Sequence, residues 1–248
     1  MKKTLLILAA LTVAQLAFSQ GTIVFVNRGG TGTATAPGQT LAPIYYGDDT
    51  GALTAKRISG NTSTGVPAGN TSYGTAAFLN AGTGGGTWTA QLWGAAGNQT
   101  ALSADEAANS PGSPLQLLVN SAAQNSTTFR ANPPAIFNGV VNQPSNPMIV
   151  PGAAGPGANT ATFQMRVWDT RGGTIATWAD VLSHPDVARG YSDLFQNAFS
   201  LGGTESPANP PPFLQGLKSF NVFIVPEPSV IALGVLGAGC LFLLRRRK

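Results

Sequence analysis

Few residues in this sequence have both the type and the spacing that catalysis requires. The tripeptide Asp-Thr-Gly that begins at Asp49 has the form of an aspartic-protease motif. That chemistry needs two such aspartates that share one proton. The closest second copy, Asp-Thr-Arg from Asp169, lacks the glycine. We therefore interpret the tripeptide at Asp49 as a tight turn.

The other groups that could hydrolyse a substrate or hold a metal ion are isolated from one another. His184 is the only histidine, and no Gly-x-Ser-x-Gly motif occurs to supply a serine nucleophile. Glu106 and Glu205 are the only glutamates ahead of the C-terminal tail, and nothing else in the sequence favours them as a glycosidase pair. Asp48 and Asp49 could contribute to a calcium site, but no Asp-x-Asp-x-Asp spacing accompanies them. The sequence therefore predicts no catalytic residue, no metal and no cofactor.

Features that bind phosphate are also weak. The glycine-rich run 82–86 leads into an expected strand, whereas a phosphate loop opens a helix, so we interpret it as a loop. The net charge is +4, but six of the 14 basic residues lie at positions 2–3 and 245–248. Between Gly21 and Val225 there are eight basic and nine acidic residues, and no basic cluster. Nucleic acid is therefore not an expected partner.

Aromatic side chains are the remaining candidates for ligand contact. Trp93 and Trp168 lie opposite the apolar faces of their expected strands, which is the position that an exposed sugar-stacking platform requires. The alternative is that they pack inside the protein, because β-sandwich cores commonly contain a tryptophan. The same two interpretations apply to the other large aromatic residues considered, namely Tyr45, Tyr46, Trp88 and Trp178.

The elements that would position these side chains are short strands. The chain has 248 residues with 31 glycines, 18 prolines and only 10% charged residues. Apolar and polar residues alternate from Thr160 to Asp169 and from Thr87 to Trp93, and more briefly around Ile23 and in residues 220–224. Weaker strand candidates are Leu41 to Tyr46, Leu115 to Val119 and Ile136 to Val141. This pattern predicts an all-β body over residues 20–225, either an antiparallel β-sandwich or a jelly roll with long loops rich in Gly, Pro and Asn.

Two short helices are expected between the strands. Ser103 followed by Glu106 forms a capping-box pattern at the start of residues 103–109. A second helical turn or two is expected over residues 178–182, ahead of Pro185. The only cysteine, Cys240, lies in the C-terminal apolar run, so the body must be stable without disulfides.

The N-terminus has the parts of a secretory signal peptide. Lys2 and Lys3 form its charged start, and an apolar stretch follows to about Val13. Ala17 and Ser19 are small residues at the two positions that a signal peptidase reads. We expect residues 1–19 to be removed by cleavage between Ser19 and Gln20, and the chain to be exported.

Residues 226–248 form a separate C-terminal tail. Its parts, in order, are the motif Pro226, Glu227 and Pro228, the uncharged run Val230–Leu244, and the basic cluster Arg245, Arg246, Arg247 and Lys248. Fifteen apolar residues in a helix span ~23 Å, somewhat less than the ~30 Å hydrocarbon core of a bilayer. The sequence predicts a short transmembrane helix whose basic end stays in the cytoplasm. The body of the protein, residues 20–225, would then lie on the outer side of the membrane.

The combination of signal peptide, Pro-Glu-Pro motif, short apolar helix and arginine-rich end resembles the PEP-CTERM sorting signal of Gram-negative bacteria. The resemblance implies recognition by an exosortase and removal of the tail near Pro226, after a transient stay in the inner membrane. It also implies delivery to the cell surface or to an extracellular matrix rich in exopolysaccharide.

The body is similar to a set of such proteins associated with Verrucomicrobia. The matching stretches are GTIVFVNR from Gly21, TWTAQLW from Thr87, FQMRVWD from Phe163 and GLKSF from Gly216. That set carries no assigned activity. The first hypothesis is therefore an exported, non-enzymatic surface or matrix protein whose partners are signal peptidase, exosortase and exopolysaccharide. The alternatives are a carbohydrate-binding module, with Trp93 and Trp168 as glycan contacts, and, third, a hydrolase.

Overall fold

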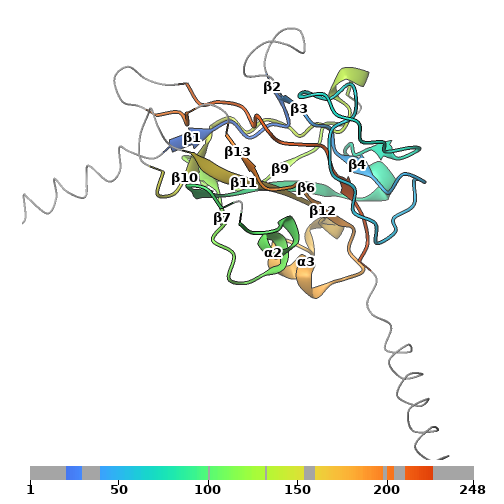
Figure 1. Cartoon of the computed structure of the whole chain (residues 1–248). Coiled ribbons are helices and arrows are strands. Elements are labelled where there is room, and N and C mark those ends of the chain that lie inside the picture. The colour runs from blue at the N-terminus through green and yellow to red at the C-terminus, as the bar shows by residue number, and fades with distance from the viewer. Residues whose placement is uncertain are drawn as a thin grey trace, which may run out of the picture.

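A computed structural model describes residues 21–29, 40–99, 101–131, 133–153, 160–197, 200–203 and 210–225 (Figure 1). The predicted signal peptide with its cleavage site, including Ala17, Ser19 and Gln20, lies outside these residues, and so does the whole predicted tail, 226–248. Within the described part of the chain, no helix has the length and apolar character needed to cross a bilayer.

The described residues form mostly β-structure, as the sequence predicts. The strands are β1 (Gly21–Ile23), β2 (Arg28–Gly29), β3 (Thr40–Leu41), β4 (Tyr45–Tyr46), β5 (Ala77–Phe78), β6 (Trp88–Ala96), β7 (Gln116–Leu117), β8 (Val119–Asn120), β9 (Thr127–Thr128), β10 (Met148–Val150), β11 (Ala161–Asp169), β12 (Arg189–Tyr191), β13 (Phe195–Gln196) and β14 (Asn221–Val222). The helices are α2 (Ala104–Asn109) and α3 (Trp178–Ser183), with short 3-10 turns η1 (Thr83–Gly85), η2 (Ala135–Phe137) and η3 (Arg171–Gly173).

Two long strands, β6 and β11, form the centre of the fold. They pair antiparallel over nine residues each, from Ala161 opposite Ala96 to Asp169 opposite Trp88. Strands β12 and β13 pair with the outer edge of β11, and β7 and β9 pair with the outer edge of β6. The two segments with the clearest period-two alternation therefore become the central pair, which confirms the strongest strand predictions.

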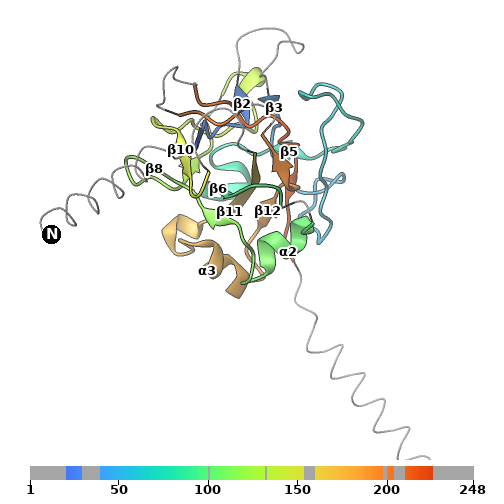
Figure 2. The ribbon, with the colours of Figure 1, turned by 60° about the vertical axis from the view of Figure 1, so that its left-hand side comes forward.

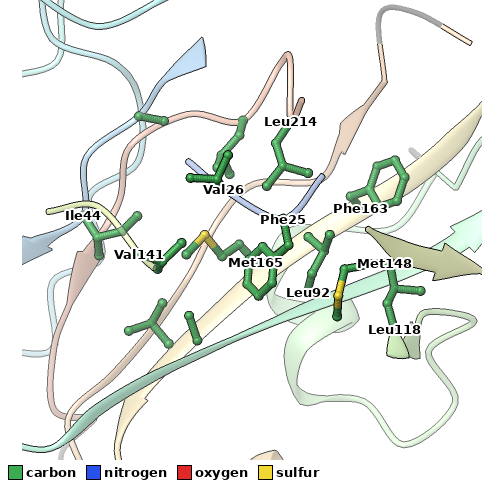
Figure 3. Close-up of a cluster of buried hydrophobic side chains, with 14 of the residues drawn as sticks. Phe25, Val26, Ile44, Leu92, Leu118, Val141, Met148, Phe163, Met165 and Leu214 are labelled. Carbon is green, nitrogen blue, oxygen red and sulfur yellow. The ribbon is translucent and has the colours of Figure 1, made fainter. Parts of the chain in front are cut away.

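Three smaller sheets lie beside this six-stranded sheet. Their strand orders are β1-β10-β8, β14-β4-β5 and β2-β3. All of their pairings are antiparallel except that of β14 with β4. A hydrophobic cluster, called the first core below, contains residues of the six-stranded sheet such as Phe163 and Met165 together with Ile44 and Met148 from the opposite side (Figure 3).

The opposite face of β6 and β11 is also covered. A second core contains Trp168, Trp178, Val181, Tyr191 and Phe223, among other residues. Helices α2 and α3 lie together on this side of the sheet, away from β1 to β4 (Figure 1). The turned view keeps both helices on the same side (Figure 2). The central sheet is thus buried on both faces, although its sequence alternates like that of a sheet with one solvated face.

Both expected helices are present, and each starts with a capping box. In α2 the Ser103 hydroxyl accepts a hydrogen bond from the Glu106 N–H at 3.1 Å, and the Glu106 carboxylate accepts one from the Ser103 N–H at 2.9 Å. In α3, Thr177 and Asp180 make the equivalent exchange. These pairs satisfy N–H groups that have no partner inside a helix.

The weaker strand predictions are correct only in part. Residues 41–46 and 115–119 each contribute to two short strands that belong to different sheets. The predicted strand Ile136 to Val141 is wrong, because the 3-10 turn η2 occupies its start and only Val141 forms a bridge, with Phe129. Gly139 has a φ of +67°, so extended backbone is interrupted again between η2 and Val141.

Candidate functional site

A pocket of about 560 Å³ lies beside α2, α3 and β12. Its apolar wall includes Leu182, Phe223 and Val225. Its polar groups come from three distant parts of the sequence, around residues 57, 105–109 and 189–191. The volume is within the range of small-molecule sites, and such sites combine apolar walls with a few convergent polar groups.

Tyr191 and Asp105 connect β12 to α2 at this pocket. The buried Tyr191 hydroxyl donates to Asp105 Oδ1 at 2.6 Å. Burial, together with the hydrogen bond to Asp105, raises the pKa of Tyr191 to about 12. Tyr191 is therefore a neutral hydrogen-bond donor at physiological pH, and its donor position is already used.

Arg57 closes one side of the pocket. Its Nη2 lies 2.6 Å from Asp193 Oδ1, and its guanidinium carbon lies 4.8 Å from the centroid of the Tyr191 ring. Its Nε is buried and has no hydrogen-bond partner. The Arg57 side chain is thus held in place by Asp193 and Tyr191, and one of its buried donors has no acceptor.

Arg189 is the second cation of the pocket. Its side chain is only 8% exposed, and its Nη1 donates to the Val181 carbonyl at 2.8 Å. Its Nε is buried and unpartnered, and none of the ion pairs among the described residues includes it. Burial lowers the pKa of Arg189. A buried guanidinium without a carboxylate is costly, and an anionic or hydroxyl-rich ligand would reduce that cost.

The structure does not place Trp168 where a sugar platform would be. The Trp168 side chain is 0% exposed, and its indole Nε1 donates to the Ile175 carbonyl at 3.0 Å. Its ring packs edge-on against Trp178, with 5.7 Å between centroids. The sequence correctly puts Trp168 on the face opposite the first core. Of the two interpretations of Trp168, the structure supports packing and not a glycan contact, because the second core covers this face.

Trp93 is half-buried at the margin of the second core. The guanidinium carbon of Arg166 lies 3.9 Å from its ring centroid and 5.4 Å from that of Trp178. Arg166 also donates to the Ala107 carbonyl at 2.7 Å and to Gln164 Oε1 at 3.0 Å. Burial lowers the pKa of Arg166 to about 9, so it remains charged at neutral pH. One face of the Trp93 ring therefore already contacts a protein cation.

The other residues singled out in the sequence have structural surroundings. The interpretation of the tripeptide at Asp49 as a turn is confirmed, because the Thr50 N–H donates to Asp48 Oδ1 at 2.9 Å and Gly51 has a φ of +82°. His184 is exposed at the end of α3, with Nδ1 2.7 Å from the Asp180 carbonyl oxygen.

The acidic residues do not gather into a metal site in the described part of the chain. Glu106 belongs to the capping box of α2, and Glu205 lies outside the described residues. Among the residues whose placement is described, no three His, Cys, Asp or Glu side chains are grouped so that they could hold a metal ion.

Sequence reasoning missed Arg57, Arg189 and Tyr191. Arg189 and Tyr191 are two positions apart, as residues on one face of a strand are, but no motif connects them to Arg57. One local signal was available at Gly190, where a Cβ atom would lie 2.3 Å from the Asn221 carbonyl oxygen. That close approach brings β12 against β14 and so helps to bring Arg189 and Tyr191 beside Phe223. Comparison of the chain with protein-family models, with curated proteins and with solved structures gives no match.

Proposed function

We propose that this chain is an exported, non-enzymatic protein of the cell surface or extracellular matrix, with a β-sandwich body, that an exosortase processes through the C-terminal tail. One observation carries the proposal. Among the described residues, β1 is already paired at Gly21, whose N–H donates to the Ala153 carbonyl at 3.0 Å, and Phe223 still forms a bridge with Arg189. Cleavage after Ser19 and near Pro226 would leave both of these contacts in the processed chain.

The interior supports the same proposal. The first core lies between the six-stranded sheet and the smaller sheets, as in a two-layer β-body. It includes 27 buried residues and no cysteine, so burial alone stabilises the body in an oxidising compartment.

The experiment is intact-mass measurement and C-terminal peptide mapping of the protein from fractionated native cells. A chain that starts at Gln20 and ends near Pro226, outside the inner membrane, is the expected result. Replacing both Pro226 and Pro228 with alanine should leave the tail attached, whereas the matched double change at Pro211 and Pro212 in the body should not. A wild-type chain that keeps Leu244 and the terminal arginines in the inner membrane would refute processing.

Carbohydrate binding is the second candidate function. The pocket is a better candidate for the glycan site than a platform formed by Trp93 and Trp168. The pocket combines the aromatic rings of Tyr191 and Phe223 with the polar side chains of Arg57 and Asn109. On a glycan array, Asn109→Ala should reduce binding and Asn70→Ala, at an exposed site, should not. Glycan hydrolysis that disappears on changing His184 or one acidic residue would instead establish an enzyme.

A further inference from the structure

We propose that the pocket beside α2, α3 and β12 binds an acidic sugar of the uronic acid class. Arg57 and Arg189 hold the carboxylate of the sugar. Asp105 and Asn109 contact its hydroxyl groups. The inference rests on carbohydrate binding, the second candidate function, and adds the charge of the ligand. It does not depend on how the ends of the chain are processed.

Each of the two arginines has one terminal nitrogen left for a ligand. Arg57 Nη2 donates to Asp193 Oδ1 and to the Tyr191 carbonyl, and Arg189 Nη1 donates to the Val181 carbonyl. Arg57 Nη1 and Arg189 Nη2 donate to no acceptor in the described part of the chain, and, unlike the two Nε atoms, they are not enclosed. Both side chains line the pocket, and that of Arg57 is 24% exposed. These two nitrogens are therefore the donors that a ligand in the pocket can reach.

The fold brings both arginines next to one tyrosine. Arg189 and Tyr191 are two positions apart in β12, so their side chains lie on the same face of the strand. The guanidinium carbon of Arg57 lies 4.8 Å from the centroid of the Tyr191 ring. A carboxylate has two acceptor oxygens and can offer one to each guanidinium group, which gives two charge-assisted hydrogen bonds.

The acidic residues at the pocket favour a ligand with a single negative charge. Asp193 pairs with Arg57, whereas Arg189 has no carboxylate partner among the described residues. Asp105 also lines the pocket, so two arginines and two acidic residues sum to zero charge. A phosphate dianion would place excess negative charge near Asp105, and a monocarboxylate would place less. The balance therefore favours a carboxylate over a phosphate.

The remaining polar groups of the pocket are suited to hydroxyl groups. Asp105 Oδ1 accepts the Tyr191 hydroxyl, but Asp105 Oδ2 accepts no hydrogen bond from any residue that the structure describes. Asn109 adds an amide to the lining, and both side chains are exposed. A carboxylate oxygen accepts from a hydroxyl group, and an amide both donates and accepts. The volume of about 560 Å³ is large enough for one sugar ring.

A ligand-observed NMR titration of the protein purified from its native cells tests the charge preference. Methyl glucuronide and methyl glucoside share the same ring and differ at C6, where the glucuronide has a carboxylate. We expect the glucuronide to bind at least about tenfold more tightly, because charge-assisted hydrogen bonds contribute that much. Glucose 6-phosphate, a dianion, and cyclohexanecarboxylate, a ring without hydroxyl groups, should both bind more weakly than the glucuronide.

Two substitutions at one position of the rim locate the site. Ala55 lines the pocket and is exposed. Ala55→Glu adds a carboxylate that competes for the arginines, whereas Ala55→Gln has nearly the same size and no charge. The glucuronide should bind Ala55→Glu about tenfold more weakly than Ala55→Gln, and the glucoside should bind both alike. Arg57→Gln should weaken glucuronide binding by a similar factor. The pair at position 55 keeps the test valid if Arg57→Gln folds poorly.

Equal affinity for the glucuronide and the glucoside would overturn this inference and leave carbohydrate binding in place. No binding of either sugar would overturn the inference and count against carbohydrate binding at the pocket as well. Equal glucuronide binding by Ala55→Glu and Ala55→Gln would show that the acid binds elsewhere. Binding of glucose 6-phosphate or cyclohexanecarboxylate as tight as that of the glucuronide would refute the assigned ligand class.

Discussion

The two faces of the central β6–β11 pair are buried by different means. On the first-core side, Phe163 and Met165 pack among aliphatic and aromatic side chains. On the other side, the neighbouring residues Gln164 and Arg166 are equally buried but are polar. One face is buried because it is apolar, and the other because a separate part of the chain supplies its hydrogen-bond partners.

Those partners come largely from α2. The last carbonyl groups of a helix have no N–H donor within the helix. Here the Ala107 carbonyl accepts from Arg166, and the Ala108 carbonyl accepts from the Trp178 indole at 2.7 Å. Gln164 donates to the Ala104 carbonyl at 2.9 Å. The polar face of the sheet and the short helix thus satisfy each other, and a cation near a helix C-terminus is favourable.

The largest loss of stability is expected on the first-core face. Phe163→Ala removes a fully buried ring whose centroid lies 5.7 Å from that of Phe195. The substitution should lower the free energy of unfolding by about 4 kcal/mol. Phe78→Ala, at a site 39% exposed, should cost less than about 1 kcal/mol. Urea unfolding of the variants measures both, and equal losses would contradict the assignment of Phe163 to the core.

Conservative changes at adjacent residues separate the two faces most sharply. Arg166→Met keeps much of the volume but leaves the Ala107 carbonyl and Gln164 Oε1 without this donor, so it should cost about 3 kcal/mol. Met165→Leu, on the apolar face, should cost less than about 1.5 kcal/mol. The difference should persist in high salt, because the acceptors of Arg166 are neutral. Equal and small losses would show that the second face tolerates apolar packing.

Alkaline unfolding tests the contact between Tyr191 and Asp105. The pKa of Tyr191 is raised from 10.0 to about 12 in the folded protein, so this group stabilises the fold below about pH 10 and loses that contribution as the pH rises toward 12. The total effect is on the order of 2 kcal/mol. Tyr191→Phe should flatten the dependence of stability on pH in this window, and an unchanged dependence would contradict this role of Tyr191.

The capping box of α2 should have a smaller effect that is confined to the second face. Ser103→Ala removes the acceptor for the Glu106 N–H and should cost about 1 kcal/mol. Hydrogen exchange should increase in α2 and leave β1 and β10 unchanged. Faster exchange throughout the sheet would mean that the two faces do not open independently.

The smallest effect is expected at an exposed ion pair. Arg171 Nη2 lies 2.7 Å from Asp186 Oδ2, and the two side chains are 42% and 66% exposed, respectively. Arg171→Gln should change the free energy of unfolding by less than about 1 kcal/mol, and salt should reduce the difference further. A loss comparable to that of Arg166→Met would show that exposed and buried arginines contribute alike.

Much of the local structure was predictable from the sequence. The alternation over residues 160–169 identified β11 and the division of its residues between two faces. Ser103 with Glu106 identified α2, because the two residues of a capping box lie only three positions apart in the sequence. The two-residue strands were predicted poorly, because two residues are too few to show an alternation of apolar and polar side chains.

The burial of the second face and the position of the pocket could not be predicted from the sequence in the same way. Gln164 and Arg166 are the residue types of a solvated face, and the packing of α2 against them makes them buried. Arg57 and Arg189 are 132 positions apart in the numbering, and no sequence pattern connects them. Their approach depends on the pairing of β12 with β11 and its bridge to Phe223.

Four properties follow from the amino-acid sequence without any tertiary contact: the local periods, the helix starts, the absence of thiols from the body and the separation of charge between the ends and the middle. These properties depend on neighbouring residues or on composition. The fold is needed to establish which faces are buried, which arginines lack a carboxylate and where the pocket forms. Burial and charge pairing depend on contacts between distant segments, so the same arginine can be a solvated side chain or a buried cation according to what packs over it.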